Sequence, residues 1–146
     1  MSAKNIDHDA VKDALIADGW TITDDPLHVS IGERDFYVDL ALERDMIVAE
    51  RGTNRIAIEI QSFISKSTIS DFHAAVGQFL VYRSCMKAVG IERKLYLAVP
   101  DHSIERIWGE RIGVVVRVDH DIRLVSYAIE PPRIVQWIEP NDIAIS

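Results

Sequence analysis

Two carboxylates and one amide, Asp39, Glu59 and Gln61, stand in segments whose residues alternate between apolar and polar. This alternation predicts β-strands over residues 35–42 and 55–63, because successive side chains of a strand point to opposite faces. Asp39 and Glu59 each share a face with a small residue, Ala41 and Ala57. If the two strands pair, opposite Cβ atoms lie about 4.5–5.5 Å apart, so the two carboxylates are expected to approach each other.

Two carboxylates at ~5 Å repel by about 3 kcal/mol at an effective dielectric constant near 20. A divalent cation removes this cost, and Mg²⁺ in proteins takes one or two carboxylates together with water and phosphate oxygens. The pair Asp39 and Glu59 therefore predicts a site for Mg²⁺ or Mn²⁺, with the alanines leaving room for water. The competing interpretation is that both residues lie on a solvated face of the sheet.

Gln61 lies two residues beyond Glu59 and so projects beside it. An amide at this position can orient an attacking water or bind a phosphate oxygen. It does not supply the positive charge of a lysine, a difference on the scale of about 3–4 kcal/mol if that charge stabilises a transition state. Lys66 is an alternative source of positive charge.

Helices and further strands are expected around these segments. Apolar residues at helical spacing predict helices over 6–18, capped by Asn5 or Asp7 and ended by Gly19, and over 68–89, capped by Ser67 or Thr68 and ended by Gly90. A short helix is expected over 103–108. Strands are expected over 20–23, 27–31, 46–50, 94–99, 113–118, 122–127 and 133–138. The apolar run over 94–99 indicates a central strand.

This order of elements predicts one α/β domain over residues 1–146, with a central mixed β-sheet flanked by helices. The sequence contains no apolar run of the ~18 residues needed for a membrane span, and the first residues lack the apolar stretch of a secretory leader, so secretion is not expected. Its single cysteine, Cys85, suits a reducing compartment. We therefore expect a cytoplasmic protein without a membrane-spanning helix.

The net charge is −7, but the charges are unevenly distributed. Residues 1–50 contain four basic and twelve acidic residues, whereas residues 51–146 contain twelve basic and eleven acidic ones. Because phosphate binding depends on Lys and Arg, DNA would have to meet a local basic face. The candidates for this face are Arg51, Arg55, Lys66, Arg83 and Lys87.

The chain resembles a known family along nearly its whole length. The segments that carry the resemblance are His8–Leu15, Asp18–Trp20, Val38–Leu40, Ala57–Phe63, Ala75–Arg83, Leu95–Pro100 and Val135–Ile138. In this order they resemble the XisH family, the fdxN-element excision-controlling factors. The resemblance implies the restriction-endonuclease-like fold of the PD-(D/E)XK superfamily.

It also implies roles for individual residues. Asp39 and Glu59 correspond to the metal-binding carboxylates, and Gln61 stands where a lysine is usual. Gln78 and Tyr82 resemble an accessory Gln–Tyr pair near the substrate, and their i, i+4 spacing places them on one helical stripe. His8 falls near a position that is acidic in many such nucleases.

Two functions follow from the resemblance. The chain is expected to be a metal-dependent DNA endonuclease that controls excision of a DNA element. The alternative is an inactive nuclease-like adaptor that regulates a site-specific recombinase through protein partners. An XisI-type protein is the implied partner, and a homodimer is a further expectation because cutting both strands of DNA needs two sites.

Overall fold

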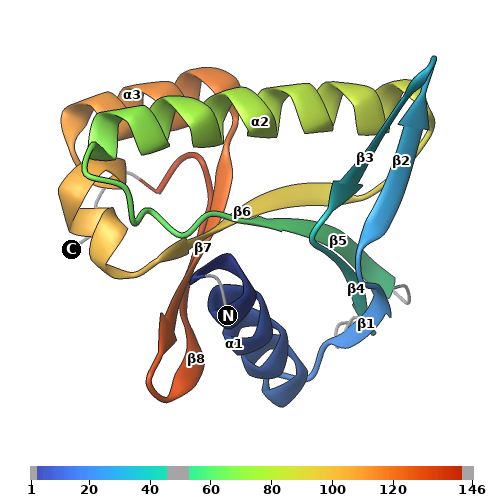
Figure 1. Ribbon diagram of the computed structural model, residues 1–146, viewed down its shortest axis with the longest axis horizontal. Coiled ribbons are helices and arrows are strands. Elements are labelled where there is room, and N and C mark those ends of the chain that lie inside the picture. The colour runs from blue at the N-terminus through green and yellow to red at the C-terminus, as the bar shows by residue number, and fades with distance from the viewer. Residues whose placement is uncertain (1–2, 46–52, 143–146) are drawn as a thin grey trace.

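The computed structural model describes residues 3–45 and 53–142, and its centre is a strongly twisted six-stranded sheet (Figure 1). The strand order is β1-β4-β5-β6-β7-β8, from β1 (Thr21–Asp24), β4 (Leu40–Asp45), β5 (Thr53–Ile60), β6 (Lys94–Pro100), β7 (Arg123–Ile129) and β8 (Pro132–Ile138). The neighbours β5, β6 and β7 are parallel, and the remaining pairs are antiparallel. The expected α/β architecture with a mixed sheet is therefore confirmed.

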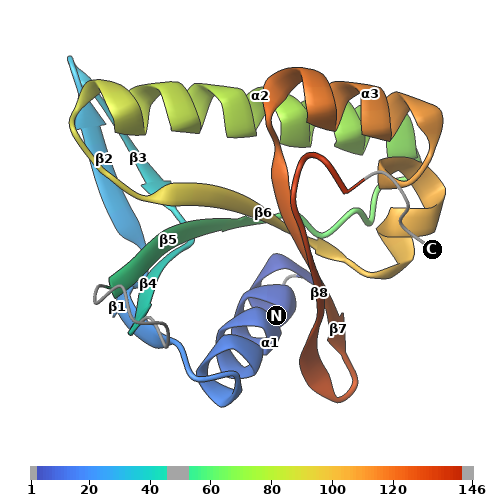
Figure 2. The ribbon, with the colours of Figure 1, turned by 180° about the vertical axis from the view of Figure 1, so that it is seen from behind.

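Helices cover both faces of this sheet. Helix α1 (Ala3–Ala17) packs below it, and α2 (Thr68–Ala88) and α3 (Arg111–His120) lie side by side above it (Figures 1 and 2). The π-helical turn η1 (Ile104–Trp108) leads from β6 into α3. Two apolar clusters result, one around Phe72, Phe79 and Trp108 beneath α2, and one joining Val11 and Leu15 of α1 to the sheet.

Strand β5 shows how the sequence pattern produces this two-sided burial. Ile56, Ile58 and Ile60 face the α1 cluster, whereas Ala57 faces the α2 cluster, as the alternation predicts. The central position of β6 between β5 and β7 is also confirmed. Its residues Leu95–Pro100 are all buried, because helices cover both faces.

Both long helices form close to the expected ranges. The Ser67 hydroxyl accepts a hydrogen bond from Ser70 N at the start of α2, and Gly90, with φ of 82°, follows its end. Helix α1 ends before Gly19, whose φ is 97°. Asn5 and Asp7 lie inside α1, so the prediction that one of them caps it is wrong.

Residues 35–42 do not form one continuous strand. The chain bends at Asp39, so β3 (Arg34–Val38) pairs only with β2 (Leu27–Ile31), whereas β4 enters the main sheet. The β2–β3 hairpin leans against α2, where Phe36 stacks on Tyr82 with centroids 4.4 Å apart (Figure 1). A uniform alternation cannot reveal that the partner strand changes in its middle.

The strand expected over 113–118 is instead helix α3. The run Val114–Val116 has high β-propensity, but tertiary packing overrides that preference. Gly113 lets α3 approach η1 closely, and Arg117 is fully buried. The guanidinium of Arg117 donates to the carbonyl oxygens of Trp108, Glu139 and Asp142. The expected strand over 46–50 and the basic candidate Arg51 lie outside the described residues.

Candidate functional site

Asp39 and Glu59 lie next to each other where β4 begins and β5 ends. The pairing of Leu40 with Ile58 in the β4–β5 ladder brings the two carboxylates to neighbouring strands. Asp39 N donates to Glu59 Oε1 at 3.1 Å, and Ile60 N donates to Asp39 Oδ2 at 2.8 Å. Each carboxylate is thus held by a backbone N–H on the strand of the other. These bonds fix their orientation and offset part of their repulsion.

The burial of the two carboxylates differs. Glu59 is 1% exposed, whereas Asp39 is half-buried at the bend between β3 and β4. A buried carboxylate requires hydrogen bonds or a cation, because transfer out of water is costly for a charged group. The pair therefore consists of one buried carboxylate, Glu59, and one more accessible carboxylate, Asp39.

Gln61 begins a chain of polar side chains that ends on helix α2. Its Nε2 donates to Oε1 of Gln78, and Nε2 of Gln78 donates to the Tyr82 hydroxyl at 3.0 Å. The stack of Tyr82 on Phe36 fixes the end of this chain. The structure thus brings together the three residues Gln61, Gln78 and Tyr82 beside the carboxylate pair.

The backbone of Gln61 is held as firmly as its side chain. Its N–H donates to the carbonyl of Ala98 on β6 at 2.9 Å, which extends the β5–β6 pairing beyond Ile60. Two residues later, Phe63 has φ of 53°, a left-handed conformation that is uncommon for an aromatic residue. This turn redirects the chain from the end of β5 toward α2, and the Phe63 ring packs edge-on against Trp108.

Asp7 on α1 is a further acidic residue of this region that the sequence interpretation missed. It is 6% exposed, and the Tyr127 hydroxyl donates to its Oδ2 at 2.5 Å and to the carbonyl of Gln61 at 3.3 Å. Burial raises the pKa of Tyr127, and the hydrogen bond to Asp7 and the charges of Asp7 and Asp39 raise it further. The hydroxyl therefore remains a donor at neutral pH. A signal was present, since Asp7 shares the buried helical face of Val11 and Ala14.

His8, the residue expected to reach the site from α1, points elsewhere. Its Nε2 lies 2.8 Å from Asp25 Oδ1, and Lys12 Nζ contacts the other oxygen of the same carboxylate at 2.7 Å. One residue along a helix rotates the side chain by about 100°, so Asp7 and His8 serve different faces. Asp7, and not His8, is thus the residue of α1 that is linked to Gln61.

The carboxylate pair offers the oxygen ligands that Mg²⁺ prefers. Within residues 3–45 and 53–142, no group of three or more His, Cys, Asp or Glu side chains is arranged to hold a metal ion. A cation at Asp39 and Glu59 would therefore complete its coordination with water and phosphate oxygens, a pattern common for Mg²⁺. The donor set fits this cation, and the fit rests on two protein ligands.

The comparisons with known proteins agree with the resemblance noted in the sequence. The family model described as "XisH protein" matches residues 1–135. The chain belongs to the XisH family. No protein of curated function matches it.

Two solved structures of XisH-type proteins are similar to the chain. One is an XisH family protein from Nostoc punctiforme PCC 73102, with 36% sequence identity and a TM-score of 0.79, covering 91% of this chain and 98% of that one. The other is an fdxN element excision controlling factor protein from Anabaena variabilis, also with 36% identity and a TM-score of 0.79, covering 92% and 98%. The likeness extends over almost the full length of both relatives.

No helix in the described part of the chain is long and apolar enough to cross a membrane.

Proposed function

We propose that this chain controls the excision of a DNA element and cleaves DNA phosphodiester bonds with Mg²⁺ held by Asp39 and Glu59. The observation that carries the proposal is the pair of reciprocal bonds between these residues, Asp39 N to Glu59 Oε1 and Ile60 N to Asp39 Oδ2. They fix two carboxylates side by side at the end of a parallel strand. The similarity to the Anabaena variabilis protein, an fdxN element excision controlling factor, supports the link to excision.

The restriction-endonuclease-like assignment is part of this proposal. In support of it, the two carboxylates lie at one end of the antiparallel pair β4–β5, with Asp39 immediately before β4, and β5 pairs in parallel with β6 on its other side. Glu59, Ile60 and Gln61 follow the Glu-x-Lys portion of the PD-(D/E)XK pattern except at the last residue. Helix α1 contributes Asp7, so an acidic side chain also comes from the first helix.

Each residue has a distinct role in the proposed reaction. When bound, Mg²⁺ supplies Lewis acidity that polarises the scissile phosphate and lowers the pKa of a water. Asp39 and Glu59 hold the cation through carboxylate oxygens. Gln61 positions the attacking water through its side-chain amide, while Gln78 and Tyr82 keep that amide in place. Tyr127 and Asp7 hold the backbone of Gln61 from the α1 side.

The direct test is nicking of supercoiled plasmid with Mg²⁺ or Mn²⁺, together with calorimetric titration of Mn²⁺. Asp39→Asn is the preferred variant, because its amide oxygen still accepts the Ile60 N–H while the charge is lost. The control is Asp13→Asn, which removes the same charge from an exposed position on α1. We expect Asp39→Asn to lose both cleavage and Mn²⁺ binding, with Asp13→Asn unchanged. Equal cleavage by Asp39→Asn and the native chain would refute the proposed site.

The second candidate function is a nuclease-like adaptor without cleavage. Gln61 favours it, because this residue cannot supply a lysine charge and its Nε2 is bonded to Gln78. The net charge of −7 also suits action through protein partners, such as an XisI-type protein, a site-specific recombinase or a second copy of the chain. The adaptor is supported if only Gln61→Lys cleaves DNA, and it is excluded if the native chain already does so.

A further inference from the structure

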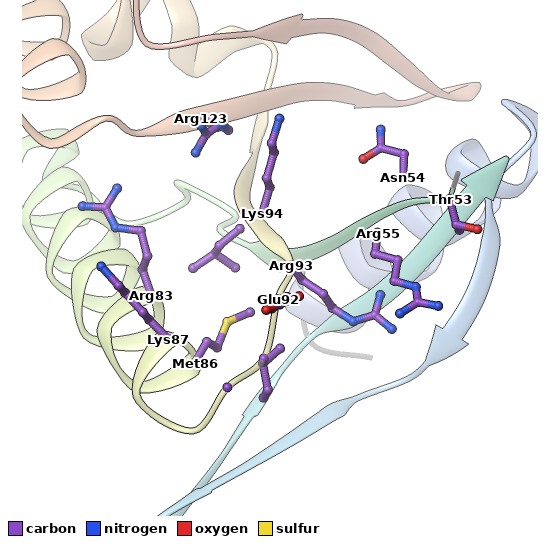
Figure 3. A pocket seen from close by; sticks show the side chains of 13 residues that line it. Thr53, Asn54, Arg55, Arg83, Met86, Lys87, Glu92, Arg93, Lys94 and Arg123 are labelled. Carbon is purple, nitrogen blue, oxygen red and sulfur yellow. The ribbon is translucent and has the colours of Figure 1, made fainter. Parts of the chain in front are cut away.

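A basic pocket of about 830 Å³ lies at the end of the sheet opposite to the carboxylate pair (Figure 3). Six basic side chains line it, with one acidic side chain, Glu92. The basic residues are Arg55, Arg83, Lys87, Arg93, Lys94 and Arg123. Such an excess of positive charge is unexpected in a chain whose net charge is −7.

The pocket is separate from the proposed catalytic site. Arg55 stands near the start of β5 and Glu59 near its end, so about 13 Å of strand separates their Cα atoms. Lys94 and Arg123 stand at the starts of β6 and β7, which run parallel to β5. None of Asp39, Glu59 and Gln61 lines the pocket.

Part of this positive charge is neutralised within the fold. Arg55 Nε lies 3.6 Å from Glu43 Oε2, and Arg123 lies within 4 Å of Asp121 and Glu139. These arginines serve mainly to join neighbouring strands and turns. They form the wall of the pocket and contribute little net charge to it.

Arg83 forms no ion pair with any residue in the described ranges, and Arg93 forms one long ion pair. Arg93 donates to the carbonyls of Leu42 and Ile56 and pairs with Asp24 Oδ2 at 3.9 Å. Arg83 donates to the carbonyls of His120 and Asp121 at the end of α3. Bonds to neutral carbonyls hold the two guanidinium groups in place without cancelling their charge.

Lys87 and Lys94 are the two lysines of the pocket. Both are exposed, and neither forms an ion pair with any residue in the described ranges. Figure 3 shows Arg83 and Lys87 projecting from α2 along one side, with Arg55 and Arg93 on the other. A ligand that reaches Lys87 or Lys94 would meet an ammonium group without a competing ion pair in the described ranges.

The C-terminal end of α2 also faces this region, and its carbonyls would oppose an anion. Local hydrogen bonds reduce that effect. Val89 N donates to the carbonyl of Cys85, Gly90 N to that of Lys87, and Ile91 N to that of Met86. The last carbonyls of the helix are therefore largely occupied, and Lys87 places a positive charge beside them.

We propose that this pocket binds a compact phosphate-bearing anion of nucleotide size. Its volume lies in the range typical of small-molecule sites. Met86, Ile91 and Leu95 provide an apolar wall for a ring, and guanidinium planes stack on aromatic bases. A long polyanion would also meet the acidic remainder of the surface, whereas a compact ligand meets only the local positive charge.

The test is calorimetric titration with ADP and ATP in EDTA at low salt, which also suppresses metal-dependent cleavage. Lys87→Gln and Lys94→Gln are the informative variants, because neither lysine has a structural partner in the described chain. Arg111→Gln is the control, because Arg111 is an exposed basic residue on α3 that lies outside the pocket. We expect saturable nucleotide binding that weakens by about tenfold in each pocket variant and with rising salt, and that changes less than twofold in the control.

Three results would overturn the proposal. The first is the absence of saturable binding of either nucleotide to the native chain. The second is an equal loss of binding in Arg111→Gln and in the pocket variants. In the third, a single-stranded oligodeoxynucleotide binds and depends on Lys87 and Lys94 while both nucleotides do not, which would assign the pocket to a nucleic-acid strand. None of these results depends on whether Asp39 and Glu59 bind metal.

Discussion

The buried hydroxyl of Tyr127 connects helix α1, strand β5 and strand β7 at the candidate site. Tyr127→Phe removes this one oxygen and leaves the ring in the apolar cluster that contains Val125. The hydroxyl donates to Asp7 Oδ2 at 2.5 Å and to the carbonyl of Gln61 at 3.3 Å. Because Asp7 is 6% exposed, water cannot readily replace the lost donor.

The expected cost follows from these two contacts. A hydrogen bond to a charged group contributes about 1.5–3 kcal/mol, and the longer bond to a carbonyl contributes less. We expect the free energy of unfolding to fall by about 2 kcal/mol at pH 7. For 146 residues the entropy of unfolding is about 0.3 kcal/mol/K, so the midpoint of thermal unfolding should fall by about 7 °C.

Urea and thermal unfolding, both followed by circular dichroism, measure the change in free energy and in midpoint, with Tyr37→Phe as the control. Tyr37 is 55% exposed, so removal of its hydroxyl should change stability by less than about 0.5 kcal/mol. A double-mutant cycle with Asp7→Ala isolates the pair and should give a coupling of about 1–2 kcal/mol. Additive effects of the two substitutions, or an unchanged midpoint in Tyr127→Phe, would refute the link between α1 and the site.

Four other substitutions test packing and buried polar contacts elsewhere in the fold. Gly113→Ala places a Cβ 2.2 Å from the Ile107 carbonyl oxygen and should destabilise the fold by at least about 3 kcal/mol. Gly77→Ala is the control, because a Cβ at this exposed position in the middle of α2 meets no neighbouring atom within 4 Å, and it should stabilise the fold by about 0.5–1 kcal/mol. Equal thermal-unfolding midpoints of the two variants would contradict the packing of α3 on η1. Burial and the bond to Glu139 raise the pKa of Tyr96 to about 12, so its contribution to stability is complete below pH 10 and is lost between pH 10 and 12. Between pH 10 and 12 the unfolding free energy of Tyr96→Phe should fall by about 2 kcal/mol less than that of the native chain. Identical pH profiles of the two proteins would exclude a stabilising role for the Tyr96 hydroxyl. Arg117→Met removes three bonds to backbone carbonyls and should cost roughly 2 kcal/mol in urea unfolding, while an unchanged midpoint would show that these bonds contribute nothing.

Strand β5 and helix α2 could be predicted from local sequence because their signals are local. The alternation of Ile56, Ile58 and Ile60 predicted which face each side chain occupies, and Ser67 and Gly90 marked the ends of α2. The pairing of Asp39 with Glu59 also followed from two strand patterns, once these strands were assumed to be neighbours. Residues four apart, such as Gln78 and Tyr82, share a helical face in any fold, so their proximity was equally predictable.

The bend at Asp39 and the helix at Gly113 depended on tertiary structure. Residues 35–42 alternate without interruption, but β3 pairs with β2 and β4 pairs with β5, and only the sheet topology shows this change of partner. The valines of α3 favour a strand in isolation. The close approach of Gly113 to η1 and the burial of Arg117 make a helix the stable choice.

The surroundings of the carboxylate pair were likewise set by the tertiary structure. Asp7 reaches Tyr127 across 120 residues of sequence, a separation that no periodicity encodes. Of the basic residues singled out in the sequence, Arg55, Arg83 and Lys87 meet in one pocket, whereas Lys66 lies outside it. The sequence by itself determined which side chains could do chemistry. The packing of α1 and α2 on opposite faces of the sheet decided which of them meet, because long-range contacts depend on chain topology and not on local spacing.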